Sequence, residues 1–70
     1  MIEKSLQING EYITLGQFIK VMDFISSGGE VKVFLINNKI LINGEKENRR
    51  GRKLYKGDSI IINNKEYKIC

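Results

Sequence analysis

The sequence predicts an α+β fold in which two short helices pack on a small, mostly antiparallel sheet. Apolar residues recur at helical spacing in two stretches of the first half of the chain. In the second half, short apolar runs alternate with turns rich in asparagine and glycine. Because 70 residues bury one small hydrophobic core, we expect a single domain spanning residues 1–70.

The N-terminal third predicts a strand followed by a helix. Apolar residues recur at every second or fourth position from Ile2 to Ile8, ahead of an Asn-Gly turn, as in a strand with one mostly apolar face. Thr14 and Gln17 have the spacing of a capping box, so a helix should start here and continue to Ser26. The apolar residues that share one face of this helix are Leu15, Phe18, Ile19, Met22 and Ile25.

A second helix is expected after the glycine-containing break at residues 26–29. Glu30 places a negative charge where the first turn of a helix favours it. The apolar residues that follow share a helical face. However, the β-branched Val31 and Val33 also alternate with Lys32 as in a strand, so periodicity does not decide between a helix and a strand. We predict a short helix that ends near Asn37-Asn38.

The C-terminal half predicts β-hairpins. Residues 40–42 form an apolar strand that runs into Asn43-Gly44, a pair that tolerates the positive φ of a two-residue turn. A further turn is expected at residues 55–58. Strands at residues 59–62 and 66–69 flank an asparagine-rich turn and should pack on the helices.

Positive charge is concentrated in residues 39–56. This segment has seven basic and two acidic residues, whereas the whole chain has a net charge of +4. Such a cluster releases counterions from a phosphate backbone, and Gly51 lets the chain approach a ligand closely. A solvated loop is the alternative, but it explains the grouped arginines less well. The candidate nucleic-acid-binding residues in the segment are Arg49, Arg50, Arg52, Lys53 and Lys39.

The sequence offers few residues that could form a catalytic site or a metal site. Histidine is absent, Cys70 is the only cysteine, and the eight carboxylates are scattered along the chain. We therefore expect a non-enzymatic protein without cofactor, metal or small-molecule substrate. Glu3 and Lys4 precede any apolar run, and the longest uncharged run is far below the roughly 20 residues of a membrane span, so we expect a cytoplasmic protein. We also expect it to be a monomer.

Several of these segments resemble the S-four RNA-binding domain, also called the αL motif. The similarity covers roughly residues 14–62. It is carried by Leu15, Phe18 and Ile19, by Ser27–Leu35, by Ile40–Gly44 and by Lys56–Ile60. Within the family, the chain is most similar to stand-alone bacterial YaaA-like proteins. That similarity is carried by Ile13–Phe18, Ser27–Gly29 and Asn48–Leu54.

The resemblance implies a helix-loop-helix and β-hairpin module that docks on structured RNA, commonly ribosomal RNA or tRNA. This chain departs from the family pattern at Thr14 and Gly28, where an arginine is common, and at Gly16, where an aspartate is common. Among the helical positions, Lys32 matches a basic position of the family, and Lys20 is a separate candidate on the first helix. The grouped arginines should therefore make most of the RNA contacts.

The expected mechanism is recognition of RNA shape, because A-form RNA hides its base edges in a deep groove. Arginines would contact phosphates or stack on an unpaired base. We expect Tyr55 and Tyr67 to cover the core rather than bind bases. The alternative function is a small adaptor that binds an acidic protein partner, and an enzyme is a more distant one. Only the family resemblance favours RNA over DNA.

Overall fold

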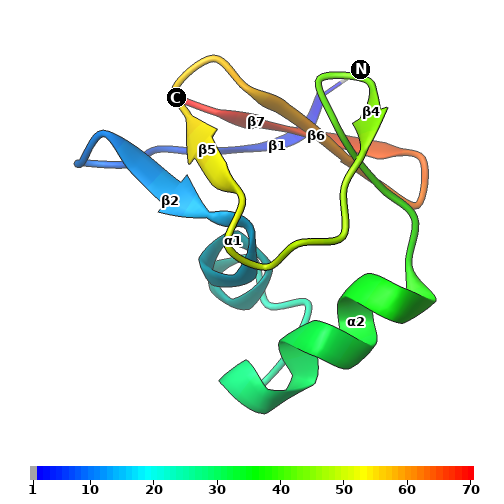
Figure 1. Cartoon of the computed structure of the whole chain (residues 1–70). Helices are drawn as coiled ribbons and strands as arrows, with labels where there is room; N and C mark the ends of the chain where they lie inside the picture. The colour runs from blue at the N-terminus through cyan, green and yellow to red at the C-terminus, as the bar shows by residue number, and fades with distance from the viewer. Residues whose placement is uncertain (1) are drawn as a thin grey trace.

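The structure, a computed structural model, describes residues 2–70 and confirms the α+β class (Figure 1). The main sheet has five strands in the order β1-β7-β6-β3-β4, and β2 and β5 form a separate antiparallel pair. Neighbouring strands of the main sheet are antiparallel, except that β1 and β7 are parallel. The elements are β1 (Ile2–Leu6), β2 (Tyr12–Thr14), α1 (Leu15–Val21), a 3-10 turn (Gly28–Glu30), α2 (Val31–Asn37), β3 (Ile40–Ile42), β4 (Glu45–Lys46), β5 (Lys53–Tyr55), β6 (Ser59–Ile62) and β7 (Lys65–Ile69).

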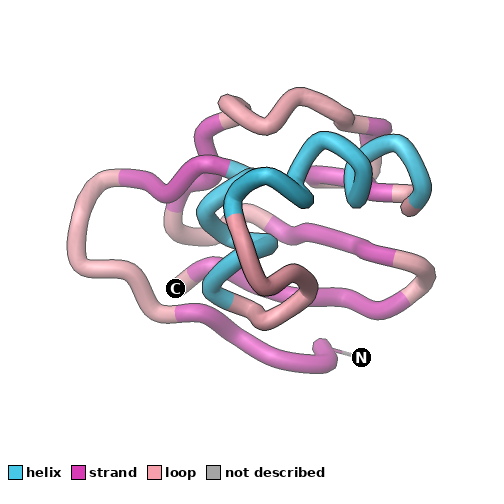
Figure 2. The backbone as a smooth tube through the Cα atoms, turned by 90° about the horizontal axis from the view of Figure 1, so that it is seen from below, coloured by secondary structure: helices cyan, strands magenta, loops and turns pink. Residues whose placement is uncertain are grey.

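Both helices lie on the same face of the main sheet, as the views from the side and from below show (Figures 1 and 2). Alternate residues of β3, β6 and β7 turn toward the helices and are buried, because successive side chains of a strand point to opposite faces. The buried apolar residues form one cluster. Its members are Leu15, Phe18, Ile19, Val31, Leu35, Ile40, Ile42, Leu54, Ile60, Ile62, Tyr67 and Ile69.

The predicted first strand and the start of the first helix are both present. β1 ends at Leu6 rather than at Ile8, and it lies beside the C-terminal strand β7. The capping box of α1 is formed, because the Gln17 N–H donates to Thr14 Oγ1 at 3.3 Å and the Thr14 N–H donates to Gln17 Oε1 at 3.0 Å.

The prediction that the first helix continues to Ser26 is wrong, because α1 ends at Val21. Asp23 has a φ of 65°, the left-handed conformation that follows many helix ends. The N–H of Phe24 donates to the carbonyl of Ile19 at 3.1 Å, as in a Schellman motif. The apolar residues beyond the end of the helix still pack against the core. They continue the apolar pattern because they are buried there, although they are not helical.

The second helix is present as predicted and ends at Asn37. Glu30 closes the preceding turn, because its Oε2 accepts hydrogen bonds from the N–H groups of Ser26 and Ser27 at 3.0 and 2.9 Å. Hydrogen bonds from the Ser26 hydroxyl and from these N–H groups lower the pKa of Glu30. The alternative strand is excluded. Val31 and Leu35, four residues apart, are buried on the same side of α2.

Two asparagine turns close the hairpins of the main sheet. Asn43 and Gly44 have φ values of 51° and 88°, and Asn63 and Asn64 have values of 50° and 72°. Two successive positive φ angles are typical of the type I′ turn, whose twist matches that of the flanking strands. The second turn is one residue shorter than predicted, so β7 begins at Lys65.

The strands β2 and β5 are not predicted from the sequence. Each has only three residues, too few to show a clear alternation of apolar and polar residues. Their closest ends are separated by 38 intervening residues, and only tertiary folding brings the two strands together. In the described part of the chain, neither helix has the length and apolar character needed to cross a membrane.

Candidate nucleic-acid interface

The arginine-containing loop between β4 and β5 is attached to the start of helix α1. The first N–H groups of a helix have no partner within the helix. Here the N–H groups of Leu15 and Gly16 donate to the carbonyl oxygens of Arg52 and Arg50 at 2.8 and 2.9 Å. The loop backbone therefore caps α1, and the helix in turn holds the arginines in place.

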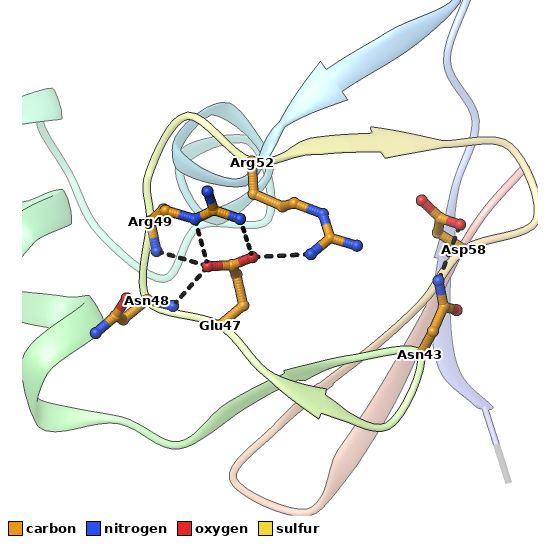
Figure 3. Close-up of polar contacts among 6 residues, drawn as sticks. All are labelled: Asn43, Glu47, Asn48, Arg49, Arg52 and Asp58. Carbon is orange, nitrogen blue, oxygen red and sulfur yellow. Dashed lines mark hydrogen bonds and ion pairs between the residues drawn. The ribbon is translucent and has the colours of Figure 1, made fainter.

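A single carboxylate, Glu47, orients two of the three arginine side chains, those of Arg49 and Arg52 (Figure 3). Its Oε2 accepts from Arg49 Nε at 3.0 Å, and its Oε1 accepts from Arg52 Nη1 at 2.8 Å. Oε2 also accepts from the backbone N–H groups of Asn48 and Arg49, both at 3.2 Å. The Glu47 N–H donates to the carbonyl of Ile40, so the same residue connects this loop to β3.

Glu47 stays charged because of these contacts. Its side chain is only 7% exposed, and the hydrogen bond from the Arg49 side chain contributes most to lowering its pKa to about 2. Arg49 remains 74% exposed and Arg52 34% exposed, so both guanidinium groups keep donors that face solvent. The sequence gives no sign of this role, because spacing alone does not distinguish Glu47 from the other scattered carboxylates.

Five of the seven candidate residues border one open hollow of about 760 Å³. Lys32 comes from α2, the arginines come from the loop, and Lys53 comes from β5. In the described residues, the exposed guanidinium of Arg50 forms no ion pair. The residues that line this basic hollow are Lys32, Leu35, Asn48, Arg49, Arg50, Gly51, Arg52, Lys53 and Tyr55.

The other two candidates lie outside the basic hollow. Lys39 borders an adjoining hollow, which also includes Lys46 and shares Leu35 and Asn48 with the first. Lys20 borders a separate hollow near the end of α1. The structure therefore groups Lys32 with the arginines, places Lys39 next to them and leaves Lys20 apart.

The two tyrosines singled out in the sequence have different environments. Tyr67 is 7% exposed, and its ring packs edge-on against those of Phe18 and Phe24, as expected for a core residue. The same expectation is wrong for Tyr55. Its side chain is 47% exposed and borders the basic hollow. Tyr12, which the sequence does not single out, lies beside it with ring centroids 5.9 Å apart.

Gly16 allows the arginine loop to approach α1 closely. A Cβ atom at this position would lie 3.4 Å from the Arg50 carbonyl oxygen and 3.5 Å from Val31 Cγ1. Gly16→Ala should therefore be tolerated, whereas the two methyl groups of Gly16→Val should displace the loop and cost about 1 to 3 kcal/mol. Urea denaturation of the two variants checks this difference, and equal stability would show that the loop is not packed tightly here.

A family model described as the S4 domain matches residues 6–70. The chain belongs to the S4 domain family. This is the family that the sequence resembles, so that identification is confirmed. This S4 domain is also 54% identical, over 57 residues, to a Bacillus subtilis (strain 168) protein named as the probable ribosome maturation protein RlbA. The match covers 81% of this chain and 80% of that relative.

Proposed function

We propose that this S4 domain binds structured RNA, and ribosomal RNA in particular, without catalysing a reaction. The observation that carries the proposal is the convergence of Lys32, Lys53 and three arginines from separate elements on one hollow. The name of the relative, a ribosome maturation protein, supports the choice of ribosomal RNA. In this proposal residues 1–70 act as one domain, as a monomer in the cytoplasm, and the partner is a ribosomal subunit or its RNA.

Each cation has a distinct part in the proposed contact. Arg50 and Lys32 have no ion pair within the described residues, so they are free to neutralise phosphates. Arg49 and Arg52 are oriented by Glu47 and present their remaining N–H donors. Lys39, beside the hollow, extends the positive surface. Because the loop is attached to α1, this surface is preformed and suited to reading backbone shape.

The affinity should depend strongly on salt. Neutralising three or four phosphates gives a slope of roughly −2 to −4 for log affinity against log salt concentration. In the Lys32→Ala/Arg50→Ala variant, two contacts are lost, so the slope should become shallower by about 1.5 and the affinity at low salt should fall roughly 10- to 50-fold. Sedimentation of the protein with purified ribosomal subunits over a series of salt concentrations measures both quantities.

A matched control removes the same charge elsewhere. Lys4 and Lys65 are exposed on β1 and β7, and neither borders the three hollows described above. Lys4→Ala/Lys65→Ala should therefore bind nearly as the wild type does. An equal loss in both variants would show that only net charge matters. If the wild type does not sediment with the subunits at any salt concentration, the proposal fails. The alternative function, an adaptor that binds an acidic protein, is then favoured.

A further inference from the structure

Two exposed tyrosines lie side by side, and one of them, Tyr55, borders the basic hollow. Tyr12 of β2 and Tyr55 of β5 are directly paired across the two-stranded sheet, which Figure 1 shows beside α1. Their side chains are 43% and 47% exposed, and their rings are tilted by 55°. Neither ring belongs to the buried core cluster. Burial in the core therefore does not account for these two rings, although their contact also supports the pairing of β2 with β5.

The surrounding backbone holds these rings in a fixed position. Leu54, between Lys53 and Tyr55, is fully buried, so its two neighbours must point outward. The Tyr55 N–H donates to Asp58 Oδ2 at 2.8 Å, and the Asp58 N–H returns a hydrogen bond to the Tyr55 carbonyl at 2.9 Å. A ring presented from an anchored strand loses little conformational entropy when it binds a ligand.

Positive charge lies against the same rings. Lys53 is diagonal to Tyr12 across the strand pair, and its Nζ lies 4.9 Å from the centre of the Tyr12 ring. Tyr55 borders the basic hollow, whereas Tyr12 borders the separate hollow that contains Lys20. A nucleic-acid strand that crosses the tyrosines would therefore find cations on both sides of them.

We propose that Tyr55, supported by Tyr12, is a stacking site for one unpaired RNA base. This inference rests on the proposed function and specifies the RNA: a helical segment next to an unpaired nucleotide. Bases within a duplex are stacked on one another and cannot reach a protein ring, whereas an unpaired base can. Lys53 and Arg50 would hold the phosphates on one side of that nucleotide, and Lys20 would hold the phosphate on the other.

Three RNA hairpins with the same stem test the stacking site. One is fully paired, one carries a single bulged adenosine, and one carries an abasic residue in the bulge. The wild type should bind the adenosine bulge about tenfold more tightly than the abasic bulge, because stacking on an aromatic ring is lost with the base. Tyr55→Ala should lose this preference while it binds the abasic hairpin as the wild type does. Tyr55→Phe, which keeps the ring, should retain the preference.

Two further variants separate this inference from the proposed function. Lys32→Ala/Arg50→Ala should weaken the binding of all three hairpins and keep the preference for the base. Val33→Ala, which trims an exposed apolar side chain on α2 away from the basic hollow, should change nothing. Wild-type binding that is equal for the adenosine and abasic bulges overturns the stacking site and leaves RNA binding intact. Absence of binding to every hairpin overturns the stacking site, and the proposed function then fails only if the wild type also does not sediment with ribosomal subunits.

Discussion

Truncation of Leu54 to alanine is expected to remove a large part of the free energy of unfolding of the protein. This side chain is fully buried, and it is the residue through which β5 and the arginine loop enter the core. Removal of a buried leucine side chain costs about 2 to 5 kcal/mol, and a domain of this size has only about 4 to 10 kcal/mol of stability. The loss therefore consumes much of the free energy of unfolding.

Urea denaturation followed by circular dichroism measures this effect. Val33→Ala is the control, because Val33 is 58% exposed and its truncation should change the free energy of unfolding by less than about 0.5 kcal/mol. RNA affinity of Leu54→Ala should fall with the folded fraction, since Lys53 and Tyr55 flank the altered residue. A Leu54→Ala variant as stable as Val33→Ala would show that β5 does not depend on this anchor.

Replacement of Glu47 should disturb the arginine loop more than any other single charge change. Glu47→Gln leaves Arg49 and Arg52 without their carboxylate and should cost about 1 to 2 kcal/mol at neutral pH. Glu47→Lys adds repulsion between like charges and should cost about 2 to 3 kcal/mol. Both variants raise the net positive charge, yet we expect weaker binding to the adenosine-bulge hairpin, because the arginines lose their orientation.

The same contact predicts how stability depends on pH. The pKa of Glu47 is about 2 in the folded protein, compared with 4.5 for an ordinary glutamate. Because the folded pKa is the lower one, the stabilisation is fully present above pH 4.5 and is lost as the pH falls toward 2. Denaturation of the wild type and of Glu47→Gln at pH 7 and pH 3 should show a smaller pH effect in the variant.

An exposed carboxylate provides the control for both experiments. Glu45 lies on β4, is exposed and forms no ion pair among the described residues. Glu45→Gln and Glu45→Lys should leave stability almost unchanged. If Glu45→Gln removed as much of the pH dependence as Glu47→Gln, the ion pairs of Glu47 would not be its source.

Local signals in the sequence predict most of the regular structure correctly. The capping box at Thr14 and the Asn43-Gly44 turn depend on residues close together in the chain, so their chemistry can be read directly. The end of α1 is not predicted, because Asp23 adopts a left-handed conformation that a non-glycine residue seldom favours by itself. The apolar residues after it continue the pattern because they are buried, not because they are helical.

The candidate site, like the fold, was predicted only in part from the sequence. The concentration of charge in residues 39–56 is visible in the sequence, and five of the seven candidates do lie around one hollow. The role of Glu47 is not visible, because its partners Arg49 and Arg52, two and five residues further along, lie in an irregular loop whose conformation no apolar periodicity predicts. Tyr12 and Tyr55 become neighbours only when β2 pairs with β5.

The sequence by itself therefore determined the family, the fold class, the hairpin turns and the location of the positive charge, since each depends on local residue chemistry or on simple periodicity. Tertiary structure decided which cations act together and which tyrosine is buried. Those outcomes depend on contacts between segments far apart in the chain. Such contacts form only when burial of one shared core brings α1, β2 and β5 together.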